Sequence, residues 1–290
     1  MLPKQSTMHY RRLFLAEPGK NLSLKKIDPG FRGKHKSHAG AKPEIESNQQ
    51  KLSELQPVLW AQKQHSLLIV LQGMDAGGKD GTVSHVLGAL NPQGVVVRGF
   101  KTPTPEEAAH DFLWRVHPHA PARGYIAVFN RSHYEDVLAP RVHGSISRDV
   151  CEQRYKRIRE FERLLADNGT QVLKFFLYIS PEEQLKRFAA RLEDPQRNWK
   201  ISESDYAERP NWDRYMTAYE DAISATSEKH APWYVIPSNH KWLRNLAVSQ
   251  IIVETLQELK LAYPEPVVDL KEIRRKYHAA LRKEEKKKRG

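Results

Sequence analysis

The chain has 290 residues, of which 47 are Lys or Arg and 35 are Asp or Glu, giving a formal net charge of +12. This length allows one large α/β domain or two small ones, and the positive charge suits an anionic partner: nucleic acid, a membrane surface or a polyanionic small molecule. A single cysteine excludes a disulfide framework and fits a cytoplasmic location, no signal-peptide pattern is present, and no apolar run approaches the roughly 18 residues of a membrane span.

Residues 1–42 predict an extended, basic N-terminal arm, because they are polar and rich in Lys, Gly and His without a sustained period. A cluster of cations in this arm either is solvated or contacts an anion; its members are Lys25, Lys26, Arg32, Lys34, His35 and Lys36. Residues 43–63 carry apolar side chains near helical spacing and predict an amphipathic helix. This helix begins the main domain, which we expect to span residues 43–262.

Residues 66–71 form an apolar run that predicts a strand buried on both faces, and a glycine-rich loop follows it. The spacing Gly73-x4-Gly78-Lys79 is that of a phosphate-binding loop, which turns backbone N–H groups and one lysine towards an anion at a helix N-terminus. The alternative, a glycine-rich turn that only begins a helix, explains the spacing less well. The residues expected to contact phosphate or nucleotide in this loop and just after it are Gly73, Met74, Ala76, Gly77, Gly78, Asp80, Gly81 and Thr82.

Two carboxylates belong to this loop, Asp75 and Asp80, and Asp80 stands where a Ser or Thr usually follows the lysine. A phosphate-binding loop seldom carries two negative charges unless a cation lies between them. We therefore expect Asp75 and Asp80 to hold Mg²⁺, or Mn²⁺ in its place.

Further apolar runs predict strands at residues 95–100, 124–129, 172–179 and 233–237. Between and after them, helices are predicted at residues 82–90, 106–117, 147–168, from 181, and at 241–259. This alternation predicts an α/β fold with a five-stranded parallel sheet and helices on both faces. The charged residues 263–290 predict a tail that is helical from about residue 269 and solvated or frayed.

Polar side chains begin abruptly after two of the strands, at the sheet edge where doubly wound folds bind ligands. Lys101 follows the second strand, while Asn130, Arg131, Ser132 and Glu135 follow the third. The second metal-holding acid of phosphate-loop enzymes occupies such a strand end, where this chain has the neutral Asn130. We expect these five residues to contact phosphate or nucleotide; a helix cap with ordinary surface charges is the alternative.

Cations flank a proline break near residue 195, and this pattern predicts a mobile helical lid over about residues 191–214. Arg187 and Arg191 share one helix face, from which arginines can close over phosphates. Lys200 lies in the same segment and is expected to contact phosphate, and Asp205 and Arg209 follow it. A solvated helical hairpin with salt bridges is the alternative.

Phosphoryl transfer fits these residues, because it needs positioning and charge neutralisation more than covalent chemistry. Lys79, Arg131 and Arg191 would neutralise charge together with the metal ion, and Asp75 would hold the metal or orient the attacking phosphate oxygen. An acceptor that is already a phosphate anion needs no general base, and Cys151 has no partner at nucleophile–base spacing. The residues alone leave the donor and the acceptor open.

Several separated motifs, in order, resemble the polyphosphate kinase-2 family over about residues 27–258. They are GMDAGGKDG at 73–81, NPQG at 91–94, NRSHYEDVL at 130–138, RLEDP at 191–195 and APWY at 231–234. Five motifs in the right order are far more specific than a phosphate loop alone.

The resemblance implies a fold similar to thymidylate kinase and the Mg²⁺-dependent transfer of the terminal phosphate of inorganic polyphosphate to a nucleoside mono- or diphosphate. Polyphosphate would lie along a basic channel and the nucleotide under the lid. The subgroup it most resembles accepts both AMP and ADP, giving ADP and ATP, and family members are commonly homo-oligomers, dimers or tetramers. The active-site positions that match by motif are Asp75, Lys79, Arg131 and Arg191, with Asp205 and Arg209 at the lid.

Two alternatives stay open at this point. An ATP-dependent nucleotide kinase on the same fold would use ATP and ignore polyphosphate. A non-catalytic protein would bind polyanions or nucleic acid through its basic arm and tail, and would keep that binding without Lys79.

Overall fold

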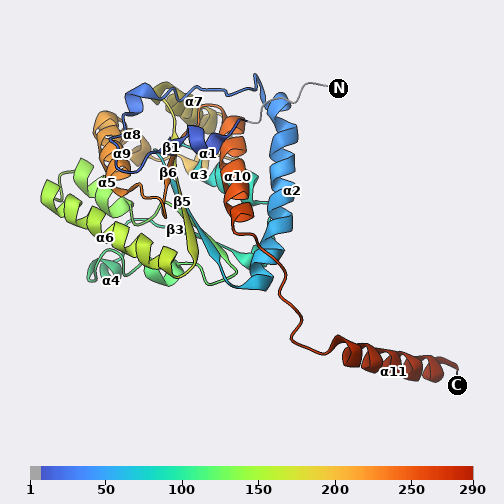
Figure 1. Ribbon diagram of the computed structural model, residues 1–290. Helices are drawn as coiled ribbons and strands as arrows, with labels where there is room; N and C mark the ends of the chain where they lie inside the picture. Colours follow the sequence, from blue (N-terminus) through green and yellow to red (C-terminus); the bar gives the residue numbers. More distant parts are fainter. Residues whose placement is uncertain (1–7, 290) are drawn as a thin grey trace.

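The computed structural model describes residues 8–289, and its centre is a six-stranded sheet in the order β1-β6-β5-β2-β4-β3 (Figure 1). The five predicted strands are all present and parallel: β2 (Ser66–Gln72), β3 (Val95–Gly99), β4 (Ile126–Asn130), β5 (Thr170–Tyr178) and β6 (Trp233–Pro237). The predicted strand count was one short, because β1 (Leu15–Ala16) adds an antiparallel edge beside β6.

Helices cover both faces of this sheet, as predicted (Figure 1). One face is covered by α2 (His38–Gln62) and α10 (Lys241–Glu258), and the other by α5 (Glu135–Val142), α6 (Arg148–Asp167) and α9 (Trp212–Thr226). Alternate side chains of β2 supply the two cores, since Leu67, Ile69 and Leu71 belong to the first and Leu68 and Val70 to the second. Every residue of β2 is buried, which explains its unbroken apolar run.

The register of the sheet brings the ends of neighbouring strands together. Leu71 of β2 pairs with Asn130 at the end of β4 and with Phe175 in β5. The chain segments that follow β2 and β4 therefore emerge side by side. After β2, the loop leads into α3 (Lys79–Thr82) and a π-helical turn, η2 (Val83–Leu87), so that the helix predicted to reach residue 90 ends earlier.

The N-terminal segment packs against the body where an extended arm was predicted. It contains α1 (Tyr10–Leu13), β1 and the short helix η1 (Leu24–Lys26). Tyr10 and Leu24 are buried, and Arg11 donates to the hydroxyl of Tyr234 at 3.3 Å. The apolar side chains of this segment are few and are spread among basic residues. The sequence therefore shows no hydrophobic periodicity that would predict their burial in the core. Residues 1–7 of the predicted arm lie outside the described residues.

Two other predictions differ from the structure. β3 was expected to be buried, but it is the sheet edge and most of its residues are exposed; the short helix η3 (Pro92–Gly94) precedes it. The helix predicted at 106–117 is only α4 (Pro105–Ala108), followed by turns and η4 (His117–His119). The Asp111 carboxylate accepts from the Leu113 N–H at 3.0 Å, and this local turn competes with a continuing helix.

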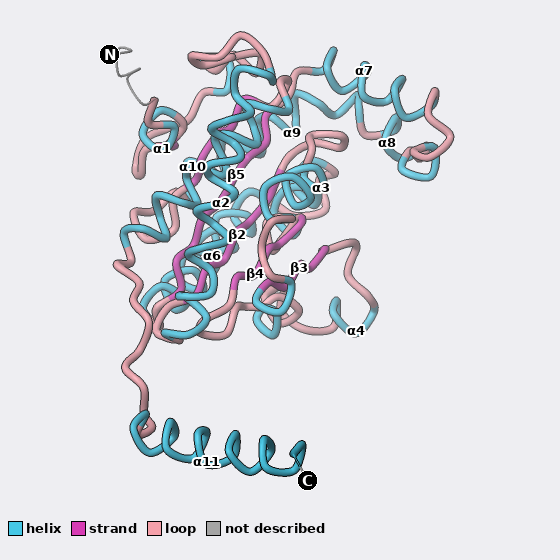
Figure 2. The backbone as a smooth tube through the Cα atoms, turned by 90° about the vertical axis from the view of Figure 1, so that its right-hand side faces the viewer, coloured by secondary structure: helices cyan, strands magenta, loops and turns pink. Residues whose placement is uncertain are grey.

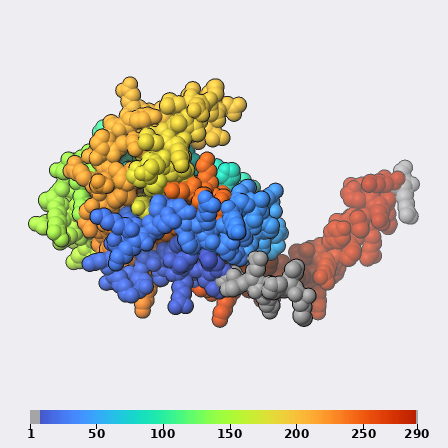
Figure 3. All heavy atoms as spheres, turned by 90° about the horizontal axis from the view of Figure 1, so that it is seen from above, coloured from blue at the N-terminus to red at the C-terminus, as the bar shows by residue number. Residues whose placement is uncertain are grey.

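A group of short helices projects over one end of the sheet, where the lid was predicted (Figure 2). It comprises α7 (Pro181–Leu192), η5 (Asn198–Lys200), α8 (Glu203–Ala207) and η6 (Arg209–Asn211). The tail forms α11 (Leu270–Arg289), which stands apart from the body in all three views (Figures 1, 2 and 3). None of the helices within residues 8–289 combines the length and apolarity needed to cross a bilayer.

Candidate active site

The loop between β2 and α3 has the backbone shape of a phosphate cradle. Gly73 and Gly78 have φ angles of 155° and 105°, and a Cβ on Gly73 would lie 2.8 Å from the Leu177 carbonyl oxygen. The Gly77 N–H donates to the Met74 carbonyl at 2.9 Å and closes the turn. Glycine is therefore needed here for close backbone packing as well as for its positive φ.

Lys79 lies under this loop and is buried. Its Nζ donates to the carbonyl oxygens of Gly73 at 2.6 Å and Met74 at 3.3 Å. Burial lowers the pKa of Lys79, and the nearby carboxylate of Asp75 opposes that change. The ammonium group is thus held within the loop by two weak acceptors, and a phosphate oxygen would be a stronger one.

Asp75 and Arg131 join the loop to the end of β4. Arg131 Nη2 donates to Asp75 Oδ1 at 2.8 Å, and its backbone N–H donates to Leu71 O at 3.1 Å. Arg131 has a φ of 62°, an unusual conformation for a side chain of this size, and such strain tends to be retained at functional sites. Burial lowers the pKa of Arg131, but Glu135 and Asp75 outweigh it and raise the pKa overall, so the guanidinium stays charged.

Asp80 connects the loop to both β4 and η5. Its carboxylate accepts from Asn130 Nδ2 at 2.8 Å and from Lys200 Nζ at 3.3 Å. Burial raises the pKa of Asp80, but these two donors outweigh it and lower the pKa overall. Nearby, burial raises the pKa of Glu135 against the opposing charges of Arg131 and Lys79.

The other residues predicted to belong to a lid contact one another and, in one case, the loop. Arg191 Nη1 donates to the Lys200 carbonyl at 3.0 Å and lies 3.9 Å from Asp205 Oδ2. Arg209 Nη1 donates to Gln184 Oε1 at 2.6 Å, and Gln184 Nε2 donates to the Asp75 carbonyl at 2.9 Å. Arg209 therefore reaches the loop through Gln184, while Arg191 and Asp205 contact one another and the segment that carries Lys200.

The hydroxyl groups of two residues predicted to bind phosphate or nucleotide are used inside the protein. The Ser132 hydroxyl is buried and accepts from Gln72 Nε2 at 3.1 Å, while the buried Thr82 hydroxyl donates to the Gly78 carbonyl at 3.1 Å. The Lys101 carbonyl accepts from Arg115 at 2.7 Å, and within the described chain no hydrogen bond or ion pair joins its side chain to the loop. The Ser132 and Thr82 hydroxyls are therefore engaged within the protein, and phosphate binding by the exposed Lys101 side chain stays a prediction.

Two arginines hold the loop from behind: Arg187, which the sequence placed with Arg191 on a helix face able to close over phosphates, and Arg244, which it did not single out. Arg187 Nη1 donates to the carbonyls of Ala76 at 2.8 Å and Gly77 at 3.1 Å, and its Nε donates to Glu183 at 2.7 Å. Arg244, from the first turn of α10, lies against the loop's glycines. The i, i+4 spacing to Arg191 predicted that Arg187 could close over phosphates, whereas in the structure it donates to loop carbonyls. Nothing in the sequence distinguished Arg244 within an apolar helix.

A fully buried ion pair supports the segment after β4. Lys174 Nζ donates to Glu162 at 2.5 Å, to the Tyr134 hydroxyl at 3.0 Å and to the Thr226 carbonyl at 2.8 Å. Burial raises the pKa of Glu162, but Lys174 and then His133 outweigh it and lower the pKa, so the carboxylate stays ionised. Because Tyr134 and His133 directly follow Ser132, this network fixes the backbone that presents Arg131.

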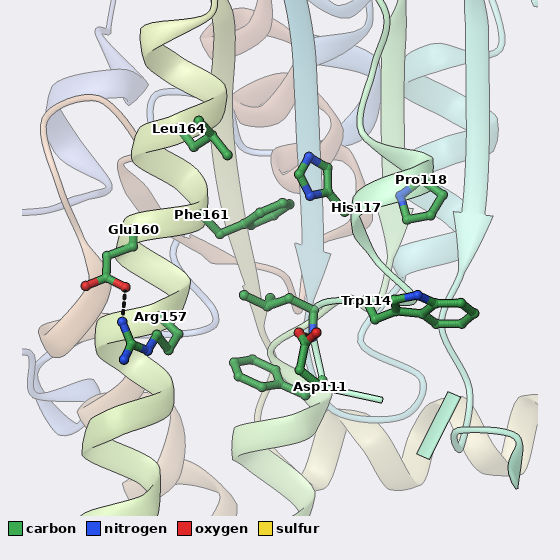
Figure 4. Close-up of a pocket in the computed structure, with 10 residues that line it drawn as sticks. Asp111, Trp114, His117, Pro118, Arg157, Glu160, Phe161 and Leu164 are labelled. Carbon is green, nitrogen blue, oxygen red and sulfur yellow. Dashed lines mark hydrogen bonds and ion pairs between the residues drawn. The ribbon is translucent and has the colours of Figure 1, made fainter. Parts of the chain in front are cut away.

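A separate cavity lies away from the phosphate loop. About 860 Å³ of open space lies between residues 111–118 and α6, and Phe161, Leu164 and Trp114 are among its lining residues (Figure 4). The Arg157–Glu160 ion pair, 2.7 Å long, borders it. Its lining residues include none of residues 73–82 or 191–214, so this cavity is separate from the candidate site.

Comparison with known proteins decides the family. The family model described as polyphosphate kinase 2 matches residues 35–263. The chain belongs to the polyphosphate kinase 2 family. This confirms the family resemblance and the enzyme class predicted from the motifs, polyphosphate-dependent phosphotransfer to nucleotides, and removes the non-catalytic alternative.

Similar polyphosphate kinase 2 proteins span nearly the whole chain. The AMP/ADP-polyphosphate phosphotransferase of Meiothermus ruber is 48% identical over 257 residues, covering 87% of this chain and 95% of that protein. The ADP-polyphosphate phosphotransferase of Rhodopseudomonas palustris is 45% identical, covering 83% and 86%. The crystal structure of polyphosphate kinase 2 from Arthrobacter aurescens TC1 matches with a TM-score of 0.90 at 42% identity, covering 94% of this chain and 97% of that one. The phosphate-loop kinase fold is thereby confirmed.

The donor groups of this polyphosphate kinase 2 fit Mg²⁺ bound together with substrate. Within residues 8–289, no three His, Cys, Asp or Glu side chains converge to make a metal site from protein alone. Mg²⁺, however, commonly uses one or two carboxylates, substrate phosphates and water. Asp75 and Asp80 offer two such carboxylates on the loop, each held by a neutral or cationic donor.

Proposed function

We propose that this protein transfers the terminal phosphate of inorganic polyphosphate to AMP and to ADP, giving ADP and ATP. The observation that carries the proposal is the convergence of Lys79, Arg131 and Lys200 on one phosphate loop. Each of these cations donates to an oxygen atom of the loop, and a phosphate oxygen could take the place of that acceptor. The printed activities of the Meiothermus ruber and Rhodopseudomonas palustris relatives support AMP and ADP as acceptors.

The transfer proceeds directly between phosphate oxygens. The Lys79 ammonium group exchanges its hydrogen bonds to the Gly73 and Met74 carbonyls for hydrogen bonds to the phosphate in the loop. Arg131 neutralises negative charge on the phosphoryl group while it is transferred. The acceptor phosphate is already an anion, so no side chain needs to remove a proton from it. Asp75 and Asp80 would hold Mg²⁺, which, when bound, neutralises charge on the phosphates.

The lid completes the site by adding cations and excluding water. Lys200 lies 3.3 Å from Asp80, so its ammonium group stands at the entrance to the loop. Arg191 is tied to the same segment through the Lys200 carbonyl. Closure of this segment over a nucleotide brings Arg191 and Lys200 to its phosphates, where they add to the positive charge of the loop.

The direct test is to separate nucleotide products after incubation with polyphosphate, Mg²⁺ and either AMP or ADP. The proposal expects ADP and ATP, respectively. Absence of product from both acceptors refutes it, while product that forms only when ATP replaces polyphosphate identifies an ATP-dependent nucleotide kinase.

We also propose a cytoplasmic homo-oligomer, a dimer or tetramer. The family resemblance and the single buried cysteine support this assignment. Light scattering on the purified chain measures the assembly, and the mass of a monomer at micromolar concentration would contradict it.

A further inference from the structure

The C-terminal helix α11 stands apart from the body of the protein (Figures 1, 2 and 3). Among residues 8–289 its ion pairs are all internal: Arg275 and Lys276 pair with Glu272, and Lys287 pairs with Glu284. Neither of the two apolar cores includes a residue of this helix. Because most helices in proteins are stabilised by packing an apolar face, a surface outside the described chain is expected to cover α11.

The helix has an apolar stripe that such a surface would cover. Its members recur every three or four residues and are Leu270, Ile273, Tyr277 and Leu281. At about 3.6 residues per turn, they lie within roughly 80° of the helix circumference. All four are exposed, and Tyr277 is 61% exposed. The stripe ends at Leu281, because residues 282–288 are all charged.

The rest of α11 is strongly basic. Residues 270–288 contain nine Lys or Arg and three Glu, so they supply six of the formal net charge of +12. Arg274 and Lys276 lie on either side of the apolar stripe. Side chains of this kind can bury their methylene groups beside an apolar layer while the charged end stays in a polar one.

Charge and apolarity together decide which kind of surface fits. A second copy, or another face of the same chain, would bring like charge, because the chain outside residues 270–288 carries the other six positive charges. A nucleic acid or a phosphate chain would neutralise the cations but has no use for the apolar stripe. A membrane with anionic lipids meets both requirements, since its headgroups attract cations and its acyl boundary accepts apolar side chains.

We propose that α11 is a membrane-surface helix, which lies flat on an anionic lipid bilayer with its apolar stripe turned towards the acyl chains. The helix is too polar to cross the bilayer, in agreement with the absence of a spanning helix within residues 8–289. Its affinity comes from the buried apolar area and from the attraction of its cations to anionic headgroups, to which the charged residues 282–288 add.

The segment before α11 leaves the active site open when the helix is attached. Residues 261–269 contain no helix or strand, and Pro264 and Pro266 keep such a segment extended. At about 3.3 Å per residue, nine residues reach up to roughly 30 Å. In Figures 1 and 2 α11 lies beyond the opposite end of the sheet from α7 and α8, so attachment places the phosphate loop on the side away from the lipid.

The first test measures co-sedimentation of the full-length protein with lipid vesicles. Wild type should bind vesicles of phosphatidylcholine and phosphatidylserine in equal parts at least about 100-fold more tightly than vesicles of phosphatidylcholine alone. A triple variant that removes three of the cations, Lys286→Gln with Lys287→Gln and Lys288→Gln, should bind the anionic vesicles about 100-fold more weakly. Added salt should weaken the binding of wild type.

The second test examines the apolar stripe without changing charge. Ile273→Gln and Tyr277→Gln should each weaken binding to the anionic vesicles about tenfold, because each removes apolar area from the buried face. Ala279→Gln, on the opposite side of the same helix, is the matched control and should bind like wild type. The Tm of the free protein should be the same in all three variants, since α11 belongs to neither core.

Three results would overturn the inference. Wild type that sediments with neither kind of vesicle shows that α11 does not bind lipid. Stripe variants that bind anionic vesicles as tightly as wild type show that the cations act alone, as they would on nucleic acid or polyphosphate. Ile273→Gln that dissociates an oligomer in light scattering, with unchanged vesicle binding, identifies a second copy as the covering surface. Phosphate transfer is read from nucleotide products without vesicles, so failure of the proposed function is a separate result.

Discussion

Replacing Lys174 with Met is expected to destabilise the fold by about 3–5 kcal/mol, because Glu162 would then be buried without its main cation. Both side chains are fully buried and 2.5 Å apart, so water cannot replace the lost charge. The same substitution also leaves the Tyr134 hydroxyl and the Thr226 carbonyl without a donor. His133, 3.3 Å from Glu162, compensates only in part.

Urea unfolding at pH 7 measures this cost, and a double variant identifies its cause. Lys174→Met with Glu162→Leu should cost clearly less than the two single changes added together, since no unpaired charge is left behind. Arg148→Met, at an exposed pair with Glu152, is the matched control and should give no measurable change. A loss below about 1 kcal/mol for Lys174→Met, or simple additivity in the double variant, would refute the reasoning.

Three further changes test the site. Gly78→Ala forces a Cβ into Arg244 at a φ of 105° and should cost about 2–4 kcal/mol in urea unfolding and abolish turnover; a stable, active variant would contradict the loop geometry. Burial raises the pKa of Glu135 in the folded state, so the stability that its carboxyl group contributes at low pH is lost as the pH rises from the ordinary pKa of a glutamate through the raised one. Glu135→Gln should therefore match wild type in thermal melts below pH 4 and be equally or more stable at pH 7. A less stable variant at pH 7 would show that the charge is needed. Lys200→Gln should raise the KM for nucleotide about tenfold in steady-state assays, because the negative charge of Asp80 would no longer be balanced by the Lys200 ammonium group. An unchanged KM would show that Lys200 does not contact the nucleotide.

The central fold could be predicted because its strands are buried on both faces. β2 is an unbroken apolar run, and the turn that follows it has fixed glycine spacing. β1 could not be predicted, because a strand of two residues is too short to show an alternating hydrophobic pattern. It also pairs with β6, which lies more than 200 residues away in the sequence. β3 shows that three consecutive valines identify a strand but not its place in the sheet, because they lie on an exposed edge.

The candidate site divides in the same way. Asp75, Lys79 and Arg131 were recognisable because each follows closely after a buried strand, β2 or β4, whose ends lie side by side. Arg244 was not, because its role depends on a contact between α10 and the phosphate loop that the sequence separates by more than 150 residues. The buried Lys174 was likewise hidden inside a strand, where its neighbours gave no sign of a carboxylate on α6.

The charge of Lys79 is the feature on which the account depends most, and one comparison tests it directly. Wild type and Lys79→Met are incubated with polyphosphate, Mg²⁺ and ADP, and the initial rate of ATP formation is measured. The account predicts that Lys79→Met loses a factor of about 100–1,000 or more in rate while the free protein melts no lower, because a buried ammonium group is replaced by an apolar chain. A Lys79→Met variant that forms ATP at the wild-type rate would contradict the assignment of this loop as the site of phosphate transfer.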